Sequence, residues 1–278
     1  MADKTTAASQ KAVTISTLLD MKRKGVKITM LTAYDFPTAR LAEEAGIDVV
    51  LVGDSVGMTK LGYESTLPVT VEEILHHTKA VKRGLSRALL VADMPYLSYE
   101  VDLKEAIRNA GRLMKEGGAH AVKIEGGMEV ASTVKEFLKI NVPVFGHLGL
   151  TPQSVNRLGG YKVQGRRPED AEKIITEARI LEGAGCAAVV LECVPAELAK
   201  EITKRLQIPT IGIGAGAHCD GQVLVSDDML GLTESRPTKF VKRYADLRVQ
   251  SLEAISSYCR EVRDGTFPGP EHSFTSQQ

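Results

Sequence analysis

The strongest constraint on the fold of this chain is a regular alternation between short apolar runs and longer amphipathic segments. Eight runs carry apolar residues at consecutive positions, and they cover residues 28–34, 49–54, 88–93, 121–125, 142–147, 187–192, 210–213 and 223–226. Consecutive apolar positions, rather than alternating ones, are typical of parallel strands covered on both faces. The sequence therefore predicts eight buried parallel strands.

The segments between most of these runs have the periodicity of amphipathic helices. Residues 71–81 and 103–113 each place their apolar side chains on one helical face. Asp102 is predicted to cap the second of these helices, because its carboxylate can accept a hydrogen bond from the first turn. Glycine recurs between a helical segment and the next strand, in the motifs at 44–48, 116–120 and 183–187. Where a helix ends and the chain turns towards the next strand, a residue in the left-handed conformation is needed, and glycine adopts it most readily.

Eight strands with intervening helices in a chain of 278 residues favour a single-domain (β/α)8 barrel, a TIM barrel. An open doubly wound sheet is the structural alternative. We expect an N-terminal segment over residues 1–27 and a catalytic barrel domain over residues 28–265. That domain includes a long final helix over residues 238–264, and a loosely held tail covers residues 266–278.

Composition narrows the class of partner. The formal net charge is zero, so no global field attracts the chain to nucleic acid or anionic lipid, and a small-molecule partner is expected. No apolar stretch approaches the ~20 residues that span a bilayer, and residues 1–13 lack the apolar core of a signal peptide. The four cysteines have no zinc-like spacing, which favours free thiols and a cytoplasmic protein.

Acidic residues end four of the eight predicted strands. These residues are Asp54, Asp93, Glu125 and Glu192. In a barrel, the active site is built where the strands end and the following loops begin. Lys123 lies two positions before Glu125, so both side chains are expected on the same side of their strand.

Each acid also has a structural interpretation. Asp54, next to Ser55, could cap a turn, and Asp93 could be a turn residue before Pro95. Glu125 could form a structural ion pair with Lys123, and Glu192 could face solvent. Four acids at equivalent strand ends are harder to explain in this way together, so the sequence favours one functional site.

Oxygen ligands alone suit a hard cation such as Mg²⁺, which takes one or two carboxylates together with water and substrate oxygens. Such an ion acts as a Lewis acid on a substrate carbonyl. A nearby carboxylate base would then remove a proton next to that carbonyl and give an enolate. Lys123 could hold an anionic oxygen of the substrate.

Three other features receive less weight. The glycine-rich run at 212–216 resembles a dinucleotide-binding loop, but it follows the seventh strand and no helix start is evident after it, so a turn is expected. His147 is interpreted as a polar residue that lines the barrel, because no nucleophile motif accompanies it. The loop at 158–166 could be a lid or an ordinary connection.

The chain closely resembles the 3-methyl-2-oxobutanoate hydroxymethyltransferases, also called ketopantoate hydroxymethyltransferases. The resemblance covers roughly residues 28–273 in family order. It rests on LTAYD at 31–35, LVGDSVGM at 51–58, STLPVT at 65–70, VADMP at 91–95, VKIEGG at 122–127, GHLGLTPQSV at 146–155, GGYKVQGR at 159–166, LECVP at 191–195 and IGIGAG at 211–216.

This resemblance implies a (β/α)8 barrel that transfers a one-carbon unit from 5,10-methylenetetrahydrofolate to 3-methyl-2-oxobutanoate. The product is 2-dehydropantoate, a precursor of pantothenate and coenzyme A. Members of the family form homo-oligomers, commonly decamers. By this resemblance, Asp54 and Asp93 are Mg²⁺ ligands, and Glu125 belongs to the metal site directly or through water. The positions that contact the oxo acid are Asp54, Ser55, Asp93 and Lys123. Glu192 matches the proton acceptor.

Three other functions remain open at this point. A related Mg²⁺-dependent barrel could cleave C–C or P–C bonds of oxo acids. A dehydrogenase would bind NAD(H) at the glycine-rich run. A non-catalytic barrel would bind the oxo acid and Mg²⁺ without turnover, although an intact Glu192 argues against it.

Overall fold

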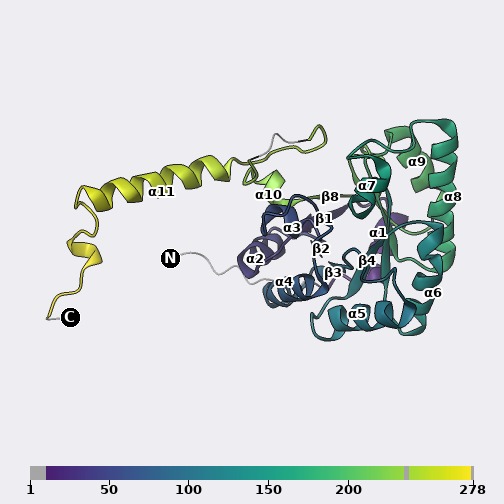
Figure 1. Ribbon diagram of the computed structural model, residues 1–278, viewed down its shortest axis with the longest axis horizontal. Helices are drawn as coiled ribbons and strands as arrows, with labels where there is room; N and C mark the ends of the chain where they lie inside the picture. The colour runs from purple at the N-terminus through teal and green to yellow at the C-terminus, as the bar shows by residue number, and fades with distance from the viewer. Residues whose placement is uncertain (1–10, 235–237, 277–278) are drawn as a thin grey trace. The chain divides into compact units, whose positions relative to one another are not determined.

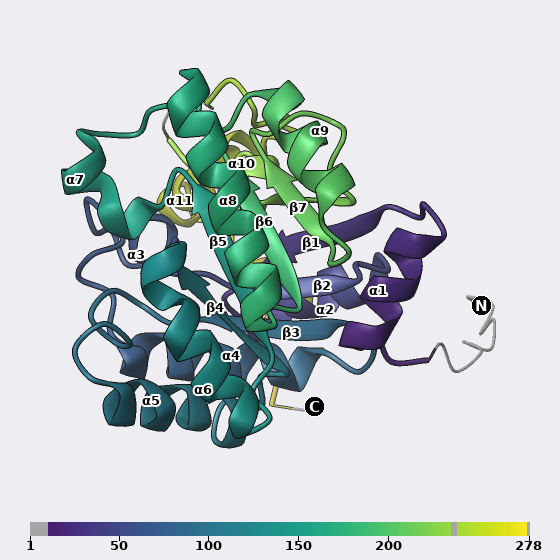
Figure 2. The same ribbon diagram turned by 90° about the vertical axis from the view of Figure 1, so that its right-hand side faces the viewer.

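A computed structural model describes residues 11–234 and 238–276 of the chain. Its strands form one closed barrel in which each strand is parallel to the next and β8 pairs with β1 (Figures 1 and 2). The strands are β1 (Ile28–Thr32), β2 (Val49–Val52), β3 (Leu89–Asp93), β4 (Ala121–Glu125), β5 (Val144–Gly149), β6 (Ala188–Glu192), β7 (Thr210–Ile213) and β8 (Gly221–Leu224). The prediction of a (β/α)8 barrel is confirmed.

Helices surround the barrel, as Figure 2 shows for α4, α5, α6 and α8. The α-helices of this part are α1 (Ile15–Arg23), α2 (Phe36–Glu44), α3 (Val56–Thr59), α4 (Val71–Gly84), α5 (Leu103–Lys115), α6 (Ala131–Lys139), α7 (Val155–Leu158), α8 (Pro168–Ala184) and α9 (Ala196–Arg205). Two 3₁₀ turns, η1 (Met128–Val130) and η2 (Pro152–Ser154), precede α6 and α7.

The helices pack on the barrel through large apolar side chains. Ile74 of α4, Leu113 of α5, Phe137 of α6 and Leu181 of α8 are each 0% exposed. Burial of a side chain of this size stabilises a fold by about 1.5–3 kcal/mol relative to leaving it in water. The apolar faces that the sequence predicts therefore hold the strands, and with them the strand ends, in place.

The predicted helix ends are also present. Asp102 accepts hydrogen bonds from the backbone N–H groups of Lys104 and Glu105. The three helix-to-strand returns have glycines with positive φ, at Gly46, Gly118 and Gly185. A left-handed residue at these points ends a helix and turns the chain back towards the barrel.

Four strands end at other residues than the sequence predicts: β1 and β2 end two residues earlier, β5 ends two residues later, and β8 is displaced by two residues. β2 ends at Val52, so Asp54 lies two residues past the strand. β8 covers Gly221–Leu224, two residues earlier than predicted. The glycine-rich run leads from β7 through a turn directly to β8, without a helix. The expected turn is therefore confirmed, and the strand–loop–helix context of a dinucleotide site is missing from this described segment.

The chain divides into two compact units, residues 1–225 and 226–278. The second unit contains α10 (Ser226–Met229), α11 (Leu247–Arg263) and η3 (Pro270–His272). The prediction of a helix over residues 238–264 is wrong at its start, because α11 begins at Leu247. The N–H group of Tyr244, before α11, donates to the carbonyl of Met229, so the backbone there pairs with the α10 region instead of forming a helix.

The boundaries expected at residues 27 and 265 stay predictions. Residues 1–10 of the N-terminal segment and residues 277–278 of the tail lie outside the described residues. Within 11–234 and 238–276, no helix has the length and apolar character needed to cross a membrane. All four cysteines are described, and each is a free thiol, as expected.

Candidate active site

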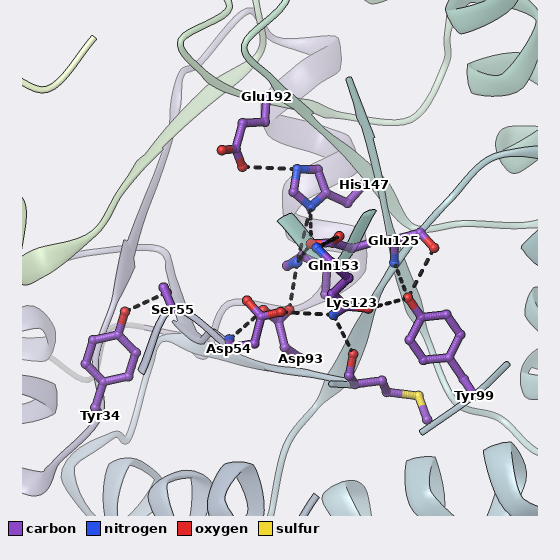
Figure 3. A network of polar contacts seen from close by, with 11 residues as sticks. Tyr34, Asp54, Ser55, Asp93, Tyr99, Lys123, Glu125, His147, Gln153 and Glu192 are labelled. Carbon is purple, nitrogen blue, oxygen red and sulfur yellow. Dashed lines mark hydrogen bonds and ion pairs between the residues drawn. The ribbon is translucent and has the colours of Figure 1, made fainter. Parts of the chain in front are cut away.

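The polar residues at the carboxyl ends of the strands are neighbours because of the register of the barrel. Asp93 of β3 pairs with Lys123 of β4, and Glu125 of β4 pairs with His147 of β5. One step further on, Gly149 of β5 pairs with Glu192 of β6. Figure 3 shows the resulting network, with the two aspartates at one end and Glu192 at the other.

Asp54 and Asp93 form a buried pair of carboxylates. The backbone N–H of Asp54 donates to Asp93 Oδ2 at 2.9 Å. Burial, together with the charges of Asp93 and Glu125, raises the pKa of Asp54 to about 8. Asp54 therefore retains a proton near neutral pH when no cation is bound, because two close buried carboxylates cannot both be charged at low cost.

Lys123 supplies positive charge inside this cluster. Its Nζ lies 2.9 Å from Asp93 Oδ1 and 3.8 Å from Glu125 Oε1, and its side chain is almost fully buried. Burial alone would lower the pKa of Lys123, but the charges of Asp93, Glu125 and Asp54 outweigh it and raise the pKa. Lys123 is thus a fixed cation. The distance from its Nζ to Glu125 Oε1 confirms that both side chains lie on the same side of β4.

His147 connects Glu125 with Glu192. Its Nδ1 lies 3.1 Å from Glu125 Oε1, and its Nε2 lies 3.2 Å from Glu192 Oε2. Burial and the Lys123 charge act to lower the pKa of His147, but the carboxylates of Glu125 and Glu192 outweigh them and raise it to about 9. The imidazolium is therefore hydrogen-bonded to Glu125 through Nδ1 and forms an ion pair with Glu192 on the side of Nε2.

Glu192, the last residue of β6, is more accessible than the rest of the network. Its side chain is 16% exposed, whereas those of Glu125 and His147 are 3% exposed. Opposite Glu192, Gly149 has φ +93°, and a Cβ at that position would lie 2.2 Å from the Glu192 carbonyl oxygen. Only glycine allows β5 to approach the base of this side chain so closely.

Gln153, on the 3₁₀ turn η2, joins three parts of the site. Its Nε2 donates to Asp54 Oδ2 at 2.9 Å and to the Met94 carbonyl at 3.0 Å. Its Oε1 accepts from the Tyr99 hydroxyl at 2.7 Å, and its backbone N–H donates to Glu125 Oε2 at 3.0 Å. The side-chain amide of Gln153 therefore orients Asp54, and the backbone N–H of the same residue orients Glu125.

Ser55 lies at the edge of the network, at the start of α3. Its Oγ is 2.8 Å from the hydroxyl of Tyr34, and the residue is partly exposed. The hydroxyl is therefore within reach of a small molecule bound beside Asp54.

The donor set fits a divalent cation held by two protein ligands. In the described part of the chain, no group of three or more His, Cys, Asp or Glu side chains is arranged to hold a metal ion. Mg²⁺ needs only one or two carboxylates when water and substrate oxygens complete its coordination. Asp54 and Asp93 could supply these two carboxylates, and the positive charge of a bound cation would favour loss of the proton from Asp54. Glu125 already accepts from Gln153 and His147.

All six residues singled out from the sequence lie in or beside this one network. His147 was recognised as a lining residue, but its connection of Glu125 to Glu192 was not foreseen. Gln153, Tyr99 and Tyr34 were not foreseen either. For Gln153 and His147, the available signal was their place within GHLGLTPQSV at 146–155, which covers the end of a predicted strand and the loop after it.

Comparison with known proteins shows which proteins this chain is similar to. The chain is 56% identical over 269 residues to the 3-methyl-2-oxobutanoate hydroxymethyltransferase of Thermoanaerobacter sp. (strain X514), with 97% of this chain and 98% of the relative covered. It is also 56% identical to the enzyme of the same name from Syntrophus aciditrophicus (strain SB), with 97% and 99% covered.

Among solved structures, the phosphoenolpyruvate phosphomutase of Streptomyces platensis subsp. rosaceus superposes with a TM-score of 0.59 at 15% identity, covering 90% of this chain and 88% of that one. This likeness shows the barrel fold alone. The sequence profile of the family described as ketopantoate hydroxymethyltransferase matches residues 12–270. With the match extending over nearly the whole chain, the chain belongs to the ketopantoate hydroxymethyltransferase family.

Proposed function

We propose that this chain transfers a one-carbon unit from 5,10-methylenetetrahydrofolate to 3-methyl-2-oxobutanoate and forms 2-dehydropantoate for pantothenate and coenzyme A synthesis. The names of the relatives support the oxo acid and the hydroxymethyl transfer. The observation that carries the proposal is that one polar network joins two different carboxylate environments. A buried aspartate pair lies at one end, and a more accessible glutamate lies at the other.

The aspartate end is proposed to bind Mg²⁺ and the oxo acid. Asp54 and Asp93 would hold the ion, with Glu125 supporting the metal site directly or through water. When bound, Mg²⁺ supplies Lewis-acid polarisation of the 2-oxo group, which makes the hydrogen on C3 more acidic. The Lys123 ammonium and the Ser55 hydroxyl would bind the oxygens of the oxo acid at this same end of the site.

The glutamate end is proposed to move the proton. Glu192 takes the C3 proton, and the electron pair left on C3 forms the new bond to the methylene carbon of the folate. Both C–N bonds of the methylene bridge break, and water supplies the hydroxyl of the new hydroxymethyl group. The two folate nitrogens take up the C3 proton and the second proton of water, which releases tetrahydrofolate. His147 keeps Glu192 oriented through its contact at 3.2 Å. A general base must lie within hydrogen-bonding reach of the proton it removes.

The test is an assay with 3-methyl-2-oxobutanoate and Mg²⁺, with and without methylenetetrahydrofolate, read by mass spectrometry. We expect 2-dehydropantoate only when the folate is present. Cleavage of the oxo acid without folate would instead indicate a lyase-type barrel. Binding of the oxo acid without any product or C3 exchange would indicate a non-catalytic protein. Either result would refute the proposal.

We also propose that the chain forms a homo-oligomer, with a decamer expected from the family. In α11, every residue is at least partly exposed. Its exposed apolar side chains are Val249, Leu252, Ile255, Tyr258 and Val262. They follow one another at three- or four-residue spacing, so a second copy of the chain could cover them. Light scattering of the protein with Leu252→Glu and Ile255→Glu, beside the unchanged protein, tests this proposal.

A cytoplasmic location is proposed as well. The four free thiols are typical of a reducing compartment. Fractionation of cells that express the chain tests the location.

A further inference from the structure

A short segment between α7 and α8 connects the two ends of the active site. We call residues 159–165 the strap. The hydroxyl of Tyr161 lies 3.9 Å from Met58 Sδ, and Met58 follows Asp54 by four residues. The backbone N–H of Gln164 donates to the carbonyl of Cys193 at 2.9 Å, directly after Glu192. The strap therefore passes from the aspartate end of the site to the glutamate end.

Tyr161 and Met58 present apolar surface to solvent at this position. Tyr161 is 54% exposed and Met58 is 43% exposed. Partial burial, followed by the negative charges of Asp54, Glu192 and Glu125, raises the pKa of Tyr161 above its ordinary value. The phenol is thus close enough to all three carboxylates to be affected by their charge. An exposed ring and thioether beside a buried ionic cluster are not accounted for by packing of the fold.

The proposed reaction needs a surface of this kind. The folate donor carries a flat heterocyclic ring next to the carbon that it transfers, and this carbon must meet C3 of the oxo acid near Glu192. Asp54, Asp93, Lys123 and Glu125 are buried, so the donor has to approach from the more exposed side of the site. Flat heterocycles bind well against the face of an aromatic ring, and thioethers also contact such rings favourably.

We infer that Tyr161 and Met58 form the binding surface for the flat ring of the one-carbon donor, and that the strap positions this surface over the site. This inference rests on the proposed function and adds the place where the donor binds. The strap begins with two glycines of positive φ, at Gly159 and Gly160. Its other end is fixed to Cys193 by the bond from Gln164. Tyr161 thereby belongs to donor binding, and the aspartate end belongs to oxo-acid binding.

The experiment compares Tyr161→Ala, Tyr161→Leu and Tyr161→Phe with the unchanged enzyme. The dissociation constant of tetrahydrofolate and the KM values of both substrates are measured. Loss of an aromatic face under a heterocycle typically weakens binding by a factor of about 5 to 150. We therefore expect at least about a tenfold rise in the folate dissociation constant for the Ala and Leu variants. Tyr161→Phe keeps the ring and should stay within about twofold. Met58→Ala should give a smaller rise than Tyr161→Ala.

C3 hydrogen exchange of the oxo acid without folate separates this inference from the proposed function. The inference is supported if the Ala and Leu variants keep the KM for the oxo acid and still catalyse exchange while folate binding weakens. It is overturned if folate binding is unchanged in both variants, or if the oxo-acid KM rises as much as the folate KM. The proposed function itself fails if the unchanged enzyme gives neither exchange nor folate-dependent product. Because Tyr161 is largely exposed, its truncation should leave the midpoint of thermal unfolding nearly unchanged. If Tyr161→Ala is unstable, Tyr161→Leu still tests the loss of the aromatic ring.

Discussion

The two ends of the active site are built differently, although both come from the carboxyl ends of neighbouring strands. At the aspartate end, Asp54 and Asp93 are buried and receive hydrogen bonds or ion pairs from Gln153, Lys123 and the backbone. At the glutamate end, Glu192 is partly exposed and lies next to His147. The proposed roles match this difference, because a site that holds an ion needs ligands fixed in advance, whereas a general base must be accessible to the substrate.

The same comparison applies to the source of stability at each end. Buried charges at the aspartate end are tolerated because each has a partner of opposite sign or a hydrogen-bond donor. The glutamate end depends more on backbone geometry, through the close approach of Gly149 to the Glu192 carbonyl. Substitutions that change charge should therefore lower stability mainly at the aspartate end. Substitutions that disturb the backbone should lower it mainly at the glutamate end.

The largest loss of stability is expected from Lys123→Met. Removal of the ammonium leaves Asp93 with a buried charge and no cation, and breaking a buried ion pair in this way typically costs about 3–5 kcal/mol. The free energy of unfolding, measured with urea, should fall by that amount. The double variant Lys123→Met with Asp93→Asn should recover a substantial part of the loss. Arg205→Met is the control, because it breaks an exposed pair with Glu201, which is worth at most about 1 kcal/mol. Equal losses for Lys123→Met and Arg205→Met would contradict this account.

Gly149→Ala tests the role of shape at the glutamate end. At φ +93° an alanine is strained, and its Cβ would meet the Glu192 carbonyl at 2.2 Å. We expect a loss of more than about 2 kcal/mol in unfolding free energy, together with slower C3 exchange because Glu192 is displaced. Gly160→Ala is a matched control, since Gly160 has φ +106° and no atom within 4 Å of an added Cβ. It should show the backbone strain of about 1 kcal/mol without the clash. Similar losses at both glycines would show that the close approach is unimportant.

Gln153→Ala should weaken the metal site without removing a ligand. Its side chain orients Asp54, and loss of such a supporting partner typically reduces metal affinity by about 10- to 100-fold. Titration calorimetry with Mg²⁺, or electron paramagnetic resonance with Mn²⁺, measures the change in affinity directly. Gln207→Ala, an exposed glutamine in the loop before β7, is the control and should bind the ion as the unchanged protein does. An unchanged affinity in Gln153→Ala would remove Gln153 from this role.

Much of this site could be predicted from the sequence because strands impose a fixed geometry. Consecutive apolar runs indicate parallel strands, and the acids that close them must meet at one end of the barrel. The two-residue period placed Lys123 and Glu125 on one side, as observed. These predictions depend on regular backbone, where the direction of a side chain follows from its position.

The residues that were missed depend on irregular backbone or on contacts across the site. Gln153 lies on a 3₁₀ turn, where no simple period says which way a side chain points. The link from His147 to Glu192 depends on the register of β5 with β6, which the sequence does not specify. The helix expected over residues 238–264 starts late because the N–H group of Tyr244 donates to the carbonyl of Met229, outside the predicted segment. Periodicity within a segment cannot reveal such partners.

Exchange of the C3 hydrogen of 3-methyl-2-oxobutanoate with deuterated water is the most direct test of the division between the two ends. It is followed by nuclear magnetic resonance with Mg²⁺ present and folate absent. We expect Glu192→Gln to abolish exchange while Mg²⁺ affinity stays within about twofold, because Glu192 lies at the other end of the network from the aspartate pair. Gln153→Ala should show the reverse pattern, with exchange that excess Mg²⁺ restores. Exchange at the unchanged rate in Glu192→Gln would show that another group takes the proton and would contradict the account.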